Sequence, residues 1–295
     1  MRRQKRSTQG SVILLLAPQR KCQRYTRAHS LWSDKSEFIF LNGNLIVPAG
    51  ILHIFKRGRR NEAMTSQAEI IKTDMEFMDI PRTGLKVSRV AIGTWAIGGW
   101  MWGGTNEAES IATIRAAIDH GINVVDTAPA YGFGRSEEIV GKAVAHARSN
   151  VIIATKVGLE WQGGKVFRNA SRTRIMREIE DSLRRLQTDY IDVYQVHWPD
   201  PLVAIEETAE AMYALYNQGK IRTIGVSNFS VDQMSRFRRV APLHVLQPPY
   251  NLFERGVEAD LLSYCRENKI ATFGYGALCR GLLSGRMRAD TAFGG

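Results

Sequence analysis

The sequence predicts an α/β protein built as a (β/α)8 TIM barrel, incomplete because only seven β/α steps can be identified. From residue 75 onward, short and nearly continuous apolar runs alternate with amphipathic segments. This alternation is typical of a parallel sheet that is covered on both faces. The glycine-rich stretch 93–104 lacks the spacing of a dinucleotide or phosphate-binding fingerprint. A barrel is therefore favoured over a doubly wound nucleotide-binding fold.

The individual elements follow from local signals. Asn106, with Glu109 three residues later, has the pattern of a helix capping box, and Gly121 marks the end of that helix. Beyond Ser171, apolar residues recur at helical spacing. The predicted strands span residues 90–94, 122–126, 151–156, 191–197, 221–227, 243–247 and 270–275. The predicted helices cover 106–121, 136–147 and 205–219, and others begin at 171 and near 230 and 254.

The charge of the chain is concentrated at its N-terminus. Residues 1–63 hold 13 of the 40 Lys and Arg residues but only 3 of the 29 Asp and Glu residues. We therefore expect residues 1–74 to form a basic, disordered extension, and residues 75–295 to form the barrel domain. Its arginine-rich composition also resembles an organelle transit peptide, but we favour an upstream extension outside the functional domain. The barrel domain is nearly neutral, so no nucleic-acid partner is predicted.

The remaining composition excludes several classes of protein. The three cysteines lack the spacing of a disulfide framework or a zinc site, which indicates a reduced, cytoplasmic protein without a bound metal. No apolar run approaches the ~18 residues needed to span a membrane. The predicted partner is a small molecule, and the sequence leaves the oligomeric state open.

Ionisable residues stand at the ends of three successive predicted strands, where barrels place their chemistry. These residues are Asp126, Lys156 and His197, and Tyr131 lies in the loop just after Asp126. A buried carboxylate needs a cation, and Lys156 on the next strand can supply it. Taken singly, each of the four has a structural interpretation as an ion pair, a core histidine or a packing residue.

Together these residues suit a proton donor for a carbonyl group. The ammonium group of Lys156 would lower the pKa of the Tyr131 phenol, and Asp126 would keep the lysine charged. His197 could donate a hydrogen bond to the carbonyl oxygen. When a carbonyl group is protonated on its oxygen, its carbon must receive a hydride, which makes a nicotinamide the natural second reactant.

Later strand ends offer groups for such a cofactor. Ser227, Asn228 and Gln247 could bind a carboxamide, and Tyr275 could stack on the pyridine ring. The segment after Tyr275 combines open backbone with positive charge where a pyrophosphate could lie. Gly281 and Gly285 supply the open backbone, and Arg280 and Arg286 supply the charge.

From about residue 77 onward the chain resembles the aldo-keto reductase family. The resemblance rests on GINVVDTAPAYGFGRSEEIVGKA, VIIATK, IDVYQVHWPD, GKIRTIGVSNFS and FGYGALCRGLLSGRM. It implies a barrel that binds NADPH, with Asp126, Tyr131, Lys156 and His197 as catalytic residues. The implied cofactor contacts are Thr94, Trp95, Asp126, Ser227, Asn228, Gln247, Tyr275, Gly276, Ala277, Leu278, Cys279, Arg280 and Arg286. Trp100, Trp161 and Trp198 are candidates for the substrate pocket.

One departure from the family pattern concerns the eighth strand and helix, which the sequence after residue 275 does not contain. The predicted domain is accordingly shorter than the ~250 residues of a typical barrel. We expect unpaired edges on the first and seventh strands. The resemblance further implies that the segment reading the 2′-phosphate of NADP is missing.

The predicted function is NADPH-dependent reduction of an aldehyde or ketone to an alcohol, with Tyr131 as proton donor. An alternative is a non-catalytic, cofactor-binding regulatory subunit resembling the potassium-channel β subunits. Those subunits typically carry Asn at the position of His197, so the histidine favours catalysis. A Schiff-base aldolase using Lys156 is a third hypothesis, which Asp126 opposes by keeping the lysine protonated. The carbonyl substrate cannot be identified from the sequence.

Overall fold

A computed structural model describes residues 12–16, 38–41, 45–48, 75–288 and 291. The chain divides into two units, one formed by residues 1–17 and 74–295 and the other by residues 18–73. In the smaller unit, β2 (Phe38–Leu41) and β3 (Leu45–Pro48) pair as an antiparallel hairpin. The division into an N-terminal extension (residues 1–74) and a barrel domain (residues 75–295) stays a prediction. Most of residues 1–74 lie outside the described residues.

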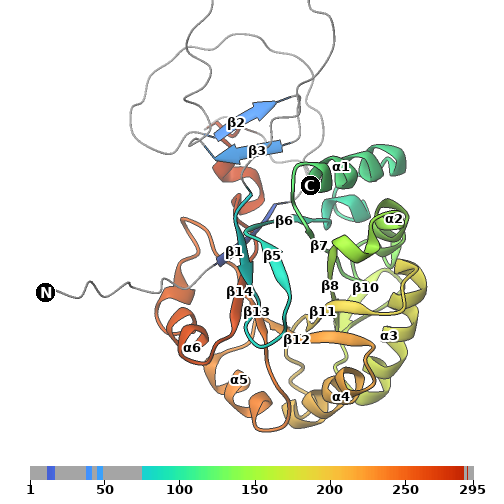
Figure 1. The fold of residues 1–295 in the computed structure, drawn as a ribbon, viewed down its shortest axis with the longest axis vertical. Helices are drawn as coiled ribbons and strands as arrows, with labels where there is room; N and C mark the ends of the chain where they lie inside the picture. Colours follow the sequence, from blue (N-terminus) through green and yellow to red (C-terminus); the bar gives the residue numbers. More distant parts are fainter. Residues whose placement is uncertain (1–11, 17–37, 42–44, 49–74, 289–290, 292–295) are drawn as a thin grey trace, which may run out of the picture. The chain divides into compact units, whose positions relative to one another are not determined.

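The larger unit is a closed barrel of parallel strands with helices on its outside (Figure 1). The strand order around it is β1-β14-β13-β12-β11-β8-β7-β6. The strands are β1 (Val12–Leu16), β6 (Val90–Gly93), β7 (Val124–Asp126), β8 (Ile152–Val157), β11 (Ile191–Val196), β12 (Ile221–Ser227), β13 (Val245–Gln247) and β14 (Ala271–Gly274). The helices are α1 (Glu107–Asp119), α2 (Arg135–Val144), α3 (Arg172–Leu186), α4 (Ile205–Asn217), α5 (Val231–Arg238) and α6 (Leu261–Glu267). The predicted fold class is confirmed.

The closure of the barrel corrects the sequence prediction. The first and seventh predicted strands, β6 and β14, have no exposed edges, because β1 pairs in parallel with both of them (Figure 1). Leu14 stands opposite Gly274 on one side and Val90 on the other. The sequence prediction placed the apolar run at 12–16 in the N-terminal extension, outside the barrel. A short, wholly apolar run is nevertheless typical of a strand in a parallel sheet.

The predicted helix signals are borne out with one exception. Asn106, Ser171 and Ser230 each cap a helix by accepting a hydrogen bond from the backbone N–H three residues later. α6, however, begins at Leu261 instead of near Glu254. The side chain of Asn251 accepts hydrogen bonds from the N–H groups of Phe253 and Glu254 and so holds this segment in a turn.

Two hairpins were not predicted. β4 (Phe77–Asp79) and β5 (Lys86–Ser88) pair ahead of the barrel, and β9 (Leu159–Gln162) and β10 (Lys165–Arg168) follow β8. Ile80, Leu85 and Val87 from the first hairpin region pack against apolar residues inside the barrel. Those inner residues precede the predicted catalytic positions on their strands, so the first hairpin covers the end of the barrel opposite the site.

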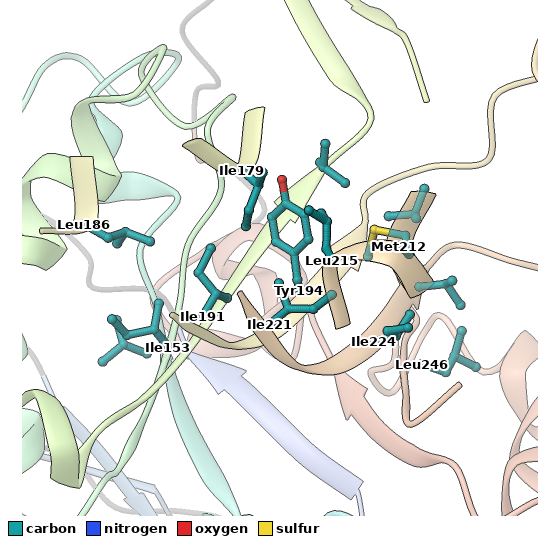
Figure 2. Packing of buried hydrophobic residues seen from close by; sticks show 14 of the residues in the cluster. Ile153, Ile179, Leu186, Ile191, Tyr194, Met212, Leu215, Ile221, Ile224 and Leu246 are labelled. Atoms are coloured by element: carbon teal, nitrogen blue, oxygen red, sulfur yellow. The ribbon is translucent and has the colours of Figure 1, made fainter. Parts of the chain in front are cut away.

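A second core lies between the strands and the surrounding helices. Figure 2 shows the ring of Tyr194 packed among Ile179, Ile191, Leu215 and Ile221. Each of these residues is almost completely buried. Among the described residues, no helix is both long and apolar enough to cross a membrane.

Charged side chains are also buried behind β8. Glu137 of α2 is inaccessible and accepts hydrogen bonds from Thr155 (2.6 Å) and from Arg185 of α3 (2.7 Å). Arg185 also pairs with Glu178, which in turn pairs with Arg174. Both buried carboxylates of this network, Glu137 and Glu178, therefore have a guanidinium partner, as burial demands. The network ties α2 and α3 to the strand that carries Lys156.

His244 makes the stability of the protein dependent on pH. It is buried, and its Nδ1 accepts a hydrogen bond from the backbone N–H of Ile224 (3.1 Å). Burial, together with the nearby charge of Arg82, lowers the pKa of His244 to about 4. Between pH ~6.5 and ~4 the unfolded chain therefore binds a proton that the folded chain does not.

Stability is consequently expected to fall as the pH falls through this range. His244 alone should account for roughly 2–3 kcal/mol between pH ~7 and ~4.5. Urea unfolding at both pH values would measure the loss for the wild type and for His244→Gln, whose amide does not titrate. The variant should lose less stability on acidification, and equal losses in the two proteins would contradict the assignment.

Candidate active site

The site is built around a buried ion pair between neighbouring strands. Asp126 ends β7 and Lys156 lies near the end of β8, and both are almost inaccessible. Nζ of Lys156 lies 2.9 Å from Oδ1 and 2.8 Å from Oδ2 of Asp126, and it also donates to the carbonyl oxygen of Thr127 (2.9 Å). Burial alone would lower the pKa of Lys156, but the charge of Asp126, with a smaller contribution from Tyr131, raises it above the usual value. The lysine is therefore an ammonium group at neutral pH.

Tyr131 lies beside this pair. Nζ of Lys156 is 3.2 Å from the Tyr131 hydroxyl. The sequence predicted that the ammonium would depress the pKa of the phenol, and that prediction is wrong for the net shift. Burial raises the pKa of Tyr131 above its usual value, and the opposing effect of Lys156 only reduces the increase. The phenol is therefore protonated at neutral pH, as a proton donor must be.

His197 follows β11 and faces Tyr131. The two rings are 5.9 Å apart, edge to face. Burial, with a contribution from the charge of Lys156, holds the pKa of His197 well below its usual value. The imidazole is therefore neutral at physiological pH, and it can donate a single hydrogen bond without adding a second positive charge beside Lys156.

The predicted amide-binding residues form a second connected group. Nδ2 of Asn228 donates to the carbonyl oxygen of His197 (3.0 Å), and Oδ1 of Asn228 accepts from the Tyr275 hydroxyl (2.9 Å). The Ser227 hydroxyl donates to the carbonyl oxygen of Gln247 (2.7 Å). Asn228 has a left-handed φ of 62°, a conformation that asparagine adopts more readily than most residues.

Two contacts around Asp126 were not predicted. Nε2 of Gln247 donates to Oδ1 of Asp126 (3.0 Å), so Gln247 supports the ion pair directly. On the other side, the backbone N–H of Thr94 donates to the carbonyl oxygen of Asp126 (2.9 Å), and the hydroxyl of Ser136 donates to Thr94 Oγ1 (2.7 Å). No local sequence signal identifies Ser136, because only the fold brings it within reach of Thr94.

The loop after β14 has an unusual backbone. Cys279, Arg280 and Gly281 have φ values of 46°, 54° and 99°, all in the left-handed region. The N–H groups of Cys279 and Gly281 donate to the carbonyl oxygens of Gly276 (2.7 Å) and Leu278 (2.8 Å), so backbone hydrogen bonds hold this loop in a turn. The guanidinium of Arg280 lies 6.0 Å from the Trp95 ring, which places this loop next to the loop after β6. Gly276, Ala277, Leu278 and Arg286 belong to the same segment.

Aromatic residues lie near Tyr131, in the loops after β6 and β7 and in β9. Trp95 lies 6.3 Å from Tyr131 and 5.3 Å from Trp102. Trp100 and Trp161 both contact the ring of Phe133, at centroid distances of 5.1 Å and 5.6 Å. Trp198 packs instead against the guanidinium of Arg168 (5.1 Å). Phe133 and Trp102 were not predicted as site residues.

The loop after β6 lies directly on the backbone that follows β7. A Cβ atom on Gly98 would lie 2.5 Å from the carbonyl carbon of Tyr131, and one on Gly132 would lie 2.1 Å from the Gly98 oxygen. Glycine at both positions therefore allows the two loops to touch. Among the described residues, no cluster of three or more His, Cys, Asp or Glu side chains could hold a metal ion.

Comparisons with known proteins agree with this architecture. The model of the aldo/keto reductase family matches residues 89–295. The aldo-keto reductase YhdN of Bacillus subtilis is 63% identical over 75% of this chain and 67% of its own length. An NADH-specific methylglyoxal reductase of Escherichia coli is 37% identical over 75% of this chain and 73% of its own.

Solved structures give the same result. The glycerol dehydrogenase of Gluconobacter oxydans superposes with a TM-score of 0.70 at 53% identity, covering 74% of this chain and 68% of its own. An aldo/keto reductase of Klebsiella pneumoniae, solved with NADP and acetate, gives a TM-score of 0.58 at 35% identity, covering 69% and 68%. The resemblance seen in the sequence is thereby confirmed: the chain belongs to the aldo/keto reductase family, a family of oxidoreductases.

Proposed function

We propose that this protein uses NADPH to reduce an aldehyde or ketone to an alcohol, with Tyr131 as the proton donor. One observation carries the proposal: a protonated phenol lies 3.2 Å from a buried ammonium group that Asp126 holds in place. A buried pair of an aspartate and a lysine is not unusual by itself. A purely structural ion pair, however, would not require a tyrosine hydroxyl beside the ammonium group. Asp126, Tyr131, Lys156 and His197 are the proposed catalytic residues.

The residues proposed to bind the nicotinamide cofactor have suitable chemical groups. Nδ2 of Asn228 donates to the His197 carbonyl oxygen and to Ser227 Oγ, so Oδ1, which already accepts from Tyr275, is the atom that can accept a further hydrogen bond from a carboxamide N–H. The positively charged side chains of Arg280 and Arg286, in the loop after β14, suit a pyrophosphate. Gln247, Ser227, Thr94 and Trp95 complete the proposed set. The cofactor would supply hydride.

The residues around the substrate carbonyl each have a separate role in the reduction. His197, neutral and adjacent to Tyr131, orients the substrate by donating a hydrogen bond to its carbonyl oxygen. The Tyr131 hydroxyl then passes its proton to that oxygen as negative charge develops there. Lys156 stabilises the phenolate that results, since its charge favours the deprotonated phenol. Asp126 and Gln247 keep the lysine charged and aligned.

The alternatives are less well supported. A Schiff-base aldolase needs a neutral amine, but the pKa of Lys156 is raised. A regulatory cofactor-binding subunit remains the second candidate, because a probable potassium-channel β subunit of Arabidopsis thaliana is 35% identical over 72% of this chain. This alternative predicts that the protein binds the cofactor but does not turn over a substrate.

Aldehyde-dependent oxidation of NADPH and of NADH would test the proposal. Both cofactors are required in the experiment, because one relative is named as NADH-specific and another was solved with NADP. We expect turnover with NADPH that depends on added aldehyde. Tight NADPH binding without turnover on any of a broad panel of aldehydes and ketones would support the regulatory alternative, and a clear preference for NADH would overturn the assigned cofactor.

A further inference from the structure

The ammonium group of Lys156 is held largely by one short stretch of the chain. Its Nζ contacts Oδ1 (2.9 Å) and Oδ2 (2.8 Å) of Asp126 and the carbonyl oxygen of Thr127 (2.9 Å). The fourth partner is the hydroxyl of Tyr131, at 3.2 Å. Three of these four oxygens therefore belong to Asp126 and Thr127, which we call segment 126–127. The distance between the ammonium group and the Tyr131 hydroxyl depends on where this segment lies.

Three buried hydroxyl groups tie segment 126–127 to itself. Thr127 Oγ1 donates to Ser136 Oγ (3.0 Å), Ser136 Oγ donates to Thr94 Oγ1 (2.7 Å), and Thr94 Oγ1 donates to the carbonyl oxygen of Asp126 (2.9 Å). Because a carbonyl oxygen can only accept, Thr94 must use its one proton on Asp126 and is free to accept from Ser136. We call these three groups the hydroxyl bridge. It begins on Thr127 and ends on Asp126, so it closes a ring on the segment that holds Lys156.

Ser136 is the member of the hydroxyl bridge that also reaches Tyr131. It lies in the first turn of α2, and its backbone N–H donates to the carbonyl oxygen of Tyr131 (3.1 Å). Its hydroxyl is buried, as are those of Thr94 and Thr127. A buried hydroxyl that loses its partner is costly, so the bridge favours a single arrangement of its groups. Through its side chain and its backbone, Ser136 is thus joined to both parts of the chain that meet at Lys156.

We propose that Ser136 is a positioning residue for carbonyl reduction, whose hydroxyl fixes segment 126–127 and so keeps the ammonium group of Lys156 against the Tyr131 hydroxyl. The inference rests on the proposed function and deepens it. Ser136 acts through Lys156, which stabilises the phenolate that forms when Tyr131 gives its proton to the substrate oxygen. A serine that served only the stability of α2 would have no effect on that step.

The first measurement is turnover of Ser136→Ala at saturating NADPH. The change removes one oxygen, and it leaves Thr127 without its acceptor and Thr94 without its donor. For an aldehyde that the wild type reduces, kcat should fall by about tenfold to 100-fold, the size of loss that a displacement of about 1 Å causes in an active site. KM for the aldehyde should stay within about twofold, because no contact with the bound substrate is removed.

Ser182→Ala is the matched control. Ser182 is equally buried, lies on the next helix, α3, and accepts a hydrogen bond from Arg185 (3.3 Å). Both variants remove a buried hydroxyl, so both should lower the melting temperature, but only Ser136→Ala should lower kcat.

A second variant breaks the hydroxyl bridge at its first member. Thr127→Val keeps the shape of the side chain and removes the donor to Ser136, so it should also lower kcat. The double variant should lose little more than Ser136→Ala alone, since both changes interrupt the same bridge. If Ser136→Ala does not fold, Thr127→Val provides the same comparison with Ser182→Ala.

Hydrogen exchange of the Lys156 ammonium group provides a readout that needs no turnover. It can be followed by nitrogen NMR of isotope-labelled lysine, with Lys156→Met to assign the signal. Exchange should be faster in Ser136→Ala than in the wild type and in Ser182→Ala. Unchanged exchange would overturn the inference, as would faster exchange with an unchanged kcat, or equal losses of kcat in the two serine variants. If the wild type reduces no carbonyl compound, the proposed function fails, and the exchange rates decide whether Ser136 positions Lys156.

Discussion

Replacing Tyr131 with Phe is expected to lower the rate of carbonyl reduction by about 10²–10⁴-fold, the usual contribution of a general acid. The substitution removes one oxygen and leaves the ring that packs near Trp95 and His197. Affinity for NADPH, measured by fluorescence titration, should change little, because the phenol is not among the proposed cofactor contacts. The melting temperature should also stay close to that of the wild type.

Lys156→Met tests the other half of this function. Because the charge of Lys156 opposes the rise in the pKa of Tyr131, its removal should raise that pKa further and weaken the proton donor. The double variant should lose much less activity than the product of the two single losses, since both changes remove one function. Unchanged turnover in Tyr131→Phe, with instability confined to Lys156→Met, would show that the residues form only a structural ion pair.

Arg185→Ala is expected to lower the free energy of unfolding by about 3–5 kcal/mol, the cost of removing one partner from a buried ion pair. Among the described residues, only Arg185 pairs its guanidinium group with Glu137, and Glu137 is inaccessible to solvent. Its loss would leave that carboxylate with only the hydroxyl of Thr155. The side chain also packs beneath Gly134, at the start of α2.

The preceding residue provides the control. Arg184 lies on the same helix, is 70% exposed and pairs with Asp181 at the surface. Arg184→Ala should therefore cost no more than ~1 kcal/mol. Urea unfolding of both variants and the wild type would measure the two effects. Similar losses in the two variants would show that the buried network adds no more stability than a surface ion pair.

Much of the fold was predictable because its signals are local. Apolar runs gave seven of the eight strands, and the caps at Asn106, Ser171 and Ser230 gave the starts of three helices. The eighth strand was missed, since Val12–Leu16 lies far from the other strands in sequence and has no neighbouring helix pattern. A parallel strand acquires its hydrogen-bond partners only from distant segments, so its own residues identify it weakly.

The sequence alone determined the residue types of the candidate site and their positions at the ends of successive strands: Asp126, Lys156 and His197, with Tyr131 in the following loop. It also determined the family. Only the tertiary structure decided the contact between Gln247 and Asp126, the ring of Phe133 between two tryptophans, and the direction of the Tyr131 pKa shift. The physical reason is the same in each case. Burial and contacts between distant segments depend on three-dimensional distance, and the balance between desolvation and a neighbouring charge at Tyr131 cannot be read from spacing along the chain.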